Sequence, residues 1–139
     1  QLYVTQSLAQ SMVELSSNKW VVFILINIFL LIAGFFLPPV AVIVMTSAIL
    51  LPVITTLGFD PYWFAIVFTI NMEIGLITPP VGLNLYIIKG ITPDVSLSEI
   101  LKGSIPFMII MALAILILCI FPEIVTWLPD KIMGKPLGY

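Results

Sequence analysis

The chain has 139 residues, of which five are basic and seven acidic, and its formal net charge is −2. Hydrophobic residues make up 61% of the sequence and charged residues 9%, whereas soluble domains contain about 45–50% apolar residues. This composition excludes an ordinary soluble domain, and the scattered lysines form no basic cluster for binding nucleic acid. Membrane lipid is therefore the expected surroundings of most of the chain.

The first predicted elements are a lead-in segment and a helical pair. Residues 1–19 are polar and are expected to lie at the membrane interface. Residues 20–59 carry no charge, and a spanning helix needs about 20 apolar residues. We predict a re-entrant helical hairpin over 20–57, with two arms that are each about 27 Å long. Two full spans are the alternative.

A turn and a discontinuous transmembrane helix are predicted over 58–90. The sequence Gly58-Phe-Asp-Pro61 is typical of a turn. The helix that follows runs from Tyr62 to Ile77, is interrupted over 78–82 and continues over 83–88. A span of this kind crosses the membrane once.

The last third of the chain is predicted to return across the membrane. A surface loop over 91–103 contains Ser96-Leu-Ser-Glu99, a capping-box pattern that opens a short helix up to Lys102. A terminal transmembrane helix over 104–128 follows, with Pro106 in its first turn, where proline is tolerated. A tail over 129–139 completes the chain.

One seven-residue pattern, G-x-x-x-P-P-V, occurs twice within this apolar sequence. It covers Gly34 to Val40 and, 41 residues later, Gly75 to Val81. Each proline lacks an N–H and clashes with the preceding helical turn, so each pair predicts a break. Inside a bilayer a broken backbone survives only where protein buries it or where it lines a wet cavity. The breaks therefore indicate a binding site, unless they are kinks that fit neighbouring helices.

The chemistry of the breaks favours a small cation. A broken helix leaves carbonyl groups free at the end of its first half and N–H groups free at the start of its second half. Gly34 and Gly75 allow close approach to the backbone, and Thr78 adds a hydroxyl oxygen at the second break. Oxygen ligands without carboxylates or sulfur suit a hard cation such as Na⁺.

Three further polar residues near the second break are candidates for substrate binding or for a proton or cation relay. Glu73 lies about 20 Å along the helix from Asp60, and an ionisable group at that depth is a functional candidate. A helix–helix anchor is the equally weighted alternative. Asn71 precedes the break. Asn84 follows it and either faces a substrate cavity or, as the favoured alternative, forms a hydrogen bond to another helix. Asn27 in the first arm is interpreted as an interhelical hydrogen-bonding residue.

Enzyme signatures are missing from the sequence. There is no histidine, no metal-ligand cluster, no nucleophile elbow and no phosphate-binding loop. We therefore expect a protein that is not an enzyme and that uses no cofactor other than a coupling ion. Two other classes stay open, which are a pore element of an ion channel and a membrane subunit with a purely structural role.

The stretch from Trp20 to Leu128 resembles the C-terminal part of the large membrane subunit of TRAP (tripartite ATP-independent periplasmic) transporters. The resemblance is carried by Gly34-Phe-Phe-Leu-Pro-Pro39, Ile49-Leu-Leu-Pro-Val53, Gly58-Phe-Asp-Pro61 and above all Asn71-Met-Glu-Ile-Gly-Leu-Ile-Thr-Pro-Pro-Val-Gly-Leu-Asn-Leu85. One departure is Pro38, where the family often has an acidic residue.

The resemblance implies an all-α polytopic protein of the bacterial inner membrane, in which this chain is half of an elevator-type, inverted-repeat transport domain. It implies sodium-coupled uptake of a small carboxylate that a periplasmic binding protein delivers. The other expected partners are the N-terminal part of the large subunit and a small membrane subunit. By resemblance, a sodium site is formed by the backbone carbonyls of Gly34 and Gly75 together with Thr78 and Val81. The loop over 89–103 would then be cytoplasmic and the tail periplasmic.

Overall fold

The described part of the chain is entirely helical in the computed structural model. The structure describes residues 7, 11, 14 and 18–134, so most of the predicted lead-in, and the tail beyond residue 134, lie outside the described residues. The helices have the bounds α2 Lys19–Phe36, α3 Pro39–Thr56, α4 Pro61–Leu76, α5 Leu83–Ile91, α6 Leu97–Ile120 and α7 Glu123–Met133. The predicted all-α class is confirmed, and α2, α3 and α6 are long and apolar enough to cross a membrane.

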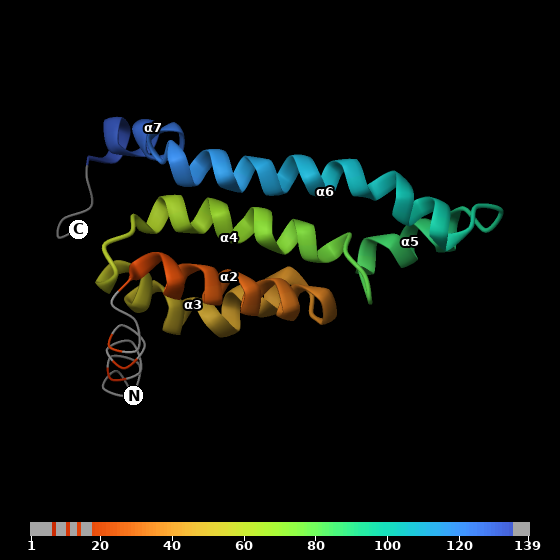
Figure 1. Ribbon diagram of the computed structural model, residues 1–139, viewed down its shortest axis with the longest axis horizontal. Coiled ribbons are helices and arrows are strands. Elements are labelled where there is room, and N and C mark those ends of the chain that lie inside the picture. The colour runs from red at the N-terminus through yellow and green to blue at the C-terminus, as the bar shows by residue number, and fades with distance from the viewer. Residues whose placement is uncertain (1–6, 8–10, 12–13, 15–17, 135–139) are drawn as a thin grey trace.

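Helices α2 and α3 form an antiparallel pair joined by two residues (Figure 1). Asn18 caps the start of α2 by accepting a hydrogen bond from the Trp20 N–H at 3.0 Å. The helix ends at Phe36 because Pro38 and Pro39 cannot donate the next backbone hydrogen bonds. Pro39 is instead the first residue of α3, a position at which proline is well tolerated. This connectivity is common to a re-entrant hairpin and to two full spans.

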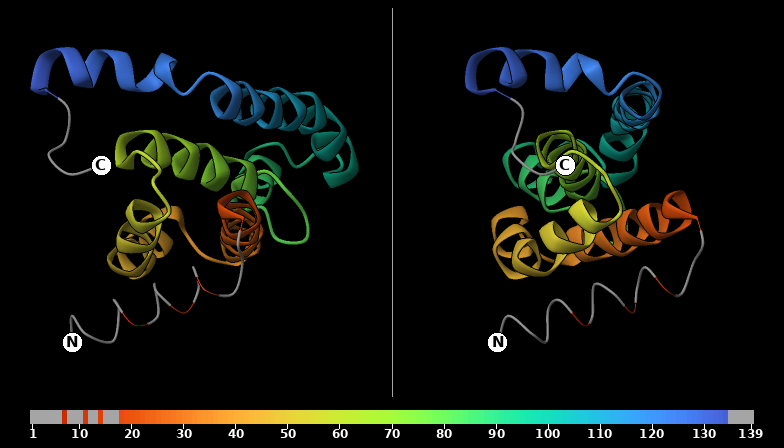
Figure 2. Two further views of the ribbon diagram at one scale, coloured as in Figure 1. Left: turned by 60° about the vertical axis from the view of Figure 1, so that its left-hand side comes forward. Right: turned by 90° about the vertical axis from the view of Figure 1, so that its left-hand side faces the viewer.

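Helix α4 lies between the α2–α3 pair and α6, and it contacts both (Figures 1 and 2). It begins at the predicted turn, where the Asp60 side chain accepts hydrogen bonds from the N–H groups of Tyr62 and Trp63 at 2.8 and 3.1 Å. Gly58 supplies a positive φ of 83° in that turn, a conformation that glycine adopts at little cost.

Buried side chains of α2, α3 and α4 form most of the core of the described residues, and the most extensive contact is between α2 and α4. An aromatic cluster formed by Trp20, Phe23, Phe59 and Trp63 joins these helices, and Phe59 stacks on Trp63 with ring centroids 5.3 Å apart. The indole N–H of Trp63 donates to the carbonyl of Leu118 in α6 at 2.7 Å. That carbonyl would otherwise bond to the N–H of residue 122, which is a proline. Trp63 therefore supplies the donor that Pro122 lacks.

The prediction for the segment between α5 and α6 needs a correction. Helix α5 extends to Ile91 rather than ending at residue 88, and the capping box of Ser96 and Glu99 is present as predicted. The helix that it opens does not stop at Lys102 but continues to Ile120. Pro106 therefore lies inside α6 and not in its first turn. It removes the hydrogen bond to the Lys102 carbonyl and its ring crowds that group, but the helix continues. Lys102 is exposed, so solvent or headgroups can satisfy the carbonyl.

The predicted terminal helix over 104–128 is also corrected at its C-terminal end. Helix α6 ends at Ile120, residues 121 and 122 form a break, and α7 begins at Glu123. The N–H of Phe121 bonds to the Ile117 carbonyl at 2.8 Å and closes α6. Because Pro122 cannot continue this ladder, the chain changes direction there and forms a separate helix, which covers the end of the predicted terminal helix and the start of the predicted tail.

Candidate functional site

The two copies of the G-x-x-x-P-P-V pattern meet in the structure. Helices α2 and α4 run in the same direction, and both breaks lie at the same end of them (Figure 1). A Cβ atom placed on Gly75 would lie 2.8 Å from the carbonyl carbon of Gly34 and 3.0 Å from its oxygen. The two backbones therefore touch where the patterns begin, and only glycine at position 75 permits this contact.

Each proline pair deprives two carbonyl groups of their helical donors. In an α-helix the carbonyl of residue i accepts from the N–H of residue i+4. Pro38 and Pro39 therefore leave the carbonyls of Gly34 and Phe35 without this bond, and Pro79 and Pro80 do the same for Gly75 and Leu76. The Gly75 carbonyl accepts instead from the Thr78 N–H at 3.3 Å. The site is thus rich in main-chain oxygens with spare lone pairs.

Thr78 and Val81 lie in the second break, between the end of α4 and the start of α5. The Thr78 hydroxyl donates to the Ile74 carbonyl and lies 3.6 Å from the sulfur of Met108 in α6. Because its proton is used in this way, the oxygen of the hydroxyl can still accept or coordinate. Val81 is half-buried and offers its backbone carbonyl. The Pro79–Pro80 peptide bond within the break is cis.

The start of α5 contributes free N–H groups to the same break. Gly82 is the cap residue, with φ of 52° and no side-chain hydrogen bond to the helix. A Cβ atom on Gly82 would approach the Thr78 carbonyl oxygen to 3.0 Å, so this turn also requires glycine. Asn84 follows in the first turn of α5 and is half-buried. A helix start of this kind attracts anionic groups.

Asn71 is held by another helix rather than pointing toward the breaks. It is 4% exposed, and its amide nitrogen donates to the backbone carbonyl of Asn27 at 2.9 Å and to the Asn27 side-chain oxygen at 3.2 Å. The Asn27 amide nitrogen in turn donates to the Phe23 carbonyl at 2.8 Å. The two asparagines therefore link α2 to α4 one to two turns before their breaks. They line a largely apolar pocket of about 540 Å³ between α2, α4 and α6.

Glu73 lies on the side of α4 away from these contacts. Asn71, Met72 and Gly75 are buried against α2, whereas Glu73 is exposed. Within the part of the chain that the structure describes, no side chain forms a hydrogen bond or ion pair with its carboxylate. The structure thus does not bring Glu73 together with Gly34, and it leaves the carboxylate free to meet another part of the protein.

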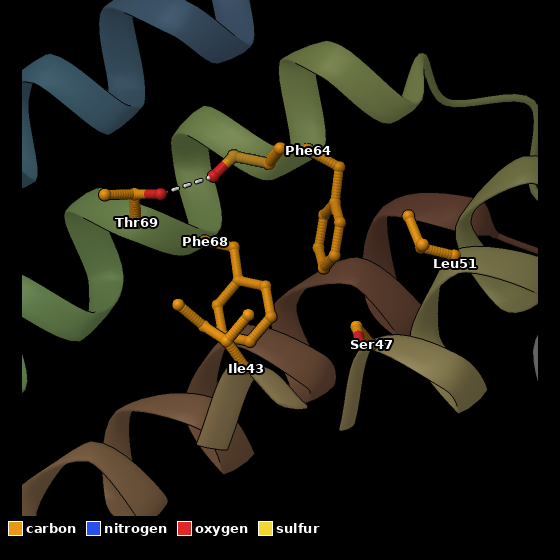
Figure 3. A pocket seen from close by; sticks show the side chains of 7 residues that line it. Ile43, Ser47, Leu51, Phe64, Phe68 and Thr69 are labelled. Carbon is orange, nitrogen blue, oxygen red and sulfur yellow. Dashed lines mark hydrogen bonds between the residues drawn. The ribbon is translucent and has the colours of Figure 1, made fainter. Parts of the chain in front are cut away.

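A second pocket, between α3 and α4, is apolar and has a volume of about 180 Å³ (Figure 3). Phe64 and Phe68 project into it from α4, opposite Ile43 of α3. The hydroxyl of Thr69 at its edge is already bonded to the Ala65 carbonyl at 2.8 Å. Such a lining offers little to a charged substrate, so the breaks remain the better candidate site.

Reasoning from sequence missed two features of this region. The interhelical hydrogen bonding predicted for Asn27 is confirmed, but Asn71 was not expected as its partner, because nothing in the sequence relates positions 44 residues apart. The role of Gly82 was also not recognised, although a glycine directly before an apolar helix start is a usable signal. Among the described residues no group of three His, Cys, Asp or Glu side chains could hold a metal ion.

Comparison with known proteins identifies relatives across nearly the whole chain. The family model "Tripartite ATP-independent periplasmic transporter, DctM component" matches residues 2–124. The C4-dicarboxylate TRAP transporter large permease protein of Vibrio cholerae is 34% identical over 96% of this chain, and its counterpart in Pseudomonas aeruginosa is 37% identical over 91%. The sialic acid TRAP transporter large permease protein of Vibrio cholerae is 30% identical over 93%.

These relatives are considerably longer than the chain, which spans 29–30% of their length. They are named as transporter permeases and not as enzymes. Together with the three helices that are able to span a membrane, they place the chain in the inner membrane. The residues that carried the resemblance in the sequence, including both proline pairs, fall within the matched range. The chain therefore belongs to the DctM family, the large permease component of tripartite ATP-independent periplasmic transporters.

Proposed function

We propose that this chain forms the part of a secondary transporter in which sodium entry is coupled to the uptake of a small organic acid. The observation that carries the proposal is the close backbone contact between Gly34 and Gly75. A Cβ atom placed on Gly75 would lie only 2.8 Å from the carbonyl carbon of Gly34. The contact brings the interrupted ends of α2 and α4 side by side. Paired broken helices of this kind form ion and substrate sites in secondary transporters.

The coupling ion is proposed to bind to the carbonyl oxygens of Gly34 and Gly75, with Thr78 and Val81 completing the site. Support comes from the prolines, which leave carbonyls at both breaks without helical donors, and from the free acceptor capacity of the Thr78 hydroxyl. A hard cation prefers such neutral oxygen ligands. Because the ion joins α2 to the second break, its binding would favour one arrangement of the two elements over others.

The substrate is proposed to be an organic anion that binds beside the sodium site. The N–H groups at the start of α5 and the Asn84 side chain are suited to a carboxylate, because helix starts carry partial positive charge. Relatives of similar identity are named for C4-dicarboxylate, isethionate and sialic acid. The class of substrate is therefore better supported than any single compound. Glu73 is proposed as a relay group, with a helix anchor as the alternative.

The proposed assembly includes the N-terminal part of the large permease, a small membrane subunit and a periplasmic binding protein. It is also proposed to work by an elevator motion of a transport domain built from inverted repeats. Membership of the tripartite family supports these proposals. The large permease of Vibrio cholerae supports them too, because the chain spans only 29% of its length.

Uptake into proteoliposomes tests the function. The complete permease is reconstituted with its small subunit, and succinate, isethionate or sialic acid is supplied with the binding protein. A sodium gradient directed inward should drive accumulation, whereas choline or equal sodium on both sides should not. Sodium-independent, non-saturating flux would indicate a channel, and normal uptake by Gly75→Val would indicate a structural role for this chain. Either result would refute the proposal.

A further inference from the structure

Helix α7 lies across the direction of the membrane-spanning helix that precedes it. The right-hand view of Figure 2 shows α6 nearly end-on, whereas α7 extends across the view. The break at Phe121 and Pro122 separates the two helices. Figure 1 places α7 at the same end of the bundle as the starts of α2 and α4, where Trp20 and Tyr62 lie. If α6 spans a bilayer, α7 is therefore at the level of its surface.

One side of α7 packs on the bundle and the opposite side is open. Val125 packs against the core cluster, and Thr126, Pro129 and Asp130 on the same side are partly buried. Successive residues of a helix are 100° apart, so Ile124, Leu128 and Ile132 form a stripe along α7 that is separate from the packed side. These three side chains are between 53% and 73% exposed. Glu123 is exposed as well and lies on the far side of the helix from Ile132.

The open apolar stripe continues the exposed apolar surface at the end of α6, which is a candidate membrane span. Ile117, Ile120 and Phe121 at the end of α6 are between 49% and 70% exposed, and α6 is the most apolar of the three candidate spans. Ile124 follows them directly in sequence. An apolar surface that passes from a spanning helix onto a helix lying crosswise fits the boundary between acyl chains and headgroups.

Lys131 is placed beside this stripe in a way that suits a phosphate headgroup. Its ammonium lies 4.9 Å from the centre of the Trp127 ring, one helical turn earlier, and Trp127 is 61% exposed. Tryptophan is enriched at membrane interfaces, and a lysine there keeps its charge at the headgroups while its stem covers apolar surface. The exposed side of α7 thus combines apolar, aromatic and basic groups.

We propose that α7 is an interfacial helix that binds the bilayer surface, with Ile124, Leu128 and Ile132 among the upper acyl chains and Lys131 at the lipid phosphates. This role is independent of sodium coupling and of the transported substrate.

Site-directed spin labelling of the complete permease tests the proposal. The native cysteines, including Cys119, are replaced by alanine, and a label is attached after Ile132→Cys or, as the matched control on the same helix, after Glu123→Cys. The permease is placed in vesicles of phosphatidylcholine and phosphatidylglycerol. Collision rates with oxygen, which concentrates in lipid, and with a water-soluble nickel chelate are then measured for each label.

The ratio of oxygen to nickel collisions should be severalfold higher at position 132 than at position 123. Lys131→Gln should lower the ratio at position 132 in vesicles that contain phosphatidylglycerol. Equal ratios at the two positions would mean that the stripe faces water and would overturn the proposal. Protection of position 132 from both reagents would also overturn it, because the stripe would then be covered by protein.

Discussion

Replacing Gly75 by alanine is the sharpest test of the site at the two breaks. The added methyl group would lie 2.8 Å from the Gly34 carbonyl carbon, whereas a comfortable carbon–carbon contact is about 3.5 Å or longer. Both atoms belong to backbone or are fixed to it, so the interrupted ends of α2 and α4 must separate by about 0.7 Å. Metal–oxygen distances tolerate only about 0.2 Å, so the proposed ligands would no longer converge.

The substitution should lower sodium affinity while leaving the protein folded. Overpacking costs about 1–3 kcal/mol, but alanine also gains up to about 1 kcal/mol over glycine within a helix. The net loss of stability is therefore about 0–2 kcal/mol by these figures. Sodium affinity, in contrast, should fall at least tenfold, which corresponds to about 1.4 kcal/mol, because the ion requires both carbonyls at once.

The assay is the thermal unfolding midpoint of the complete permease as a function of sodium concentration, with choline chloride holding the ionic strength constant. A ligand that binds only the folded state stabilises it by RT ln(1 + L/Kd), where L is the free ligand concentration, so weaker sodium binding moves the rise in the midpoint to higher sodium concentration. Gly103→Ala is the matched control, because nothing lies within 4 Å of its Cβ position. Gly34→Ala should have an intermediate effect, since its nearest neighbour at 3.3 Å is the flexible Met72 side chain. The same sodium dependence in Gly75→Ala and Gly103→Ala would refute the reasoning.

Three other substitutions test separate parts of the structure. Thr78→Ala should weaken sodium-dependent uptake because it removes a hydroxyl oxygen at the second break, whereas Thr78→Ser should retain it; equal sodium curves for both would remove Thr78 from the site. Glu73→Gln should change the pH dependence of uptake if the carboxylate is a relay, and an unaltered profile would favour an anchor. Trp63→Phe should lower the stability measured by unfolding by about 1–3 kcal/mol, because the buried Leu118 carbonyl loses its donor. Trp20→Phe, whose ring is 39% exposed, should cost less.

Features that depend on neighbours in sequence were predicted well. The breaks after Phe36 and Leu76, the turn before Pro61 and the capping box of Ser96 all follow from the local chemistry of proline, glycine and helix caps. The same local reasoning ended a helix too early at Lys102, because a single proline inside a helix removes one backbone hydrogen bond without necessarily ending the helix. It also joined the first half of α7 to the preceding helix, although Pro122 interrupts the hydrogen-bond ladder between them.

By itself, the sequence determined that the chain is helical and apolar, and that it is interrupted twice by the same pattern. These properties depend on side-chain composition and on the missing N–H groups of the prolines, which act within a few residues. Only the tertiary structure decided that Gly34 meets Gly75, that Asn71 bonds to Asn27, and that Glu73 faces away. These contacts depend on the rotation of each helix about its axis and on its depth against its neighbour, which are set by packing between residues more than 40 positions apart.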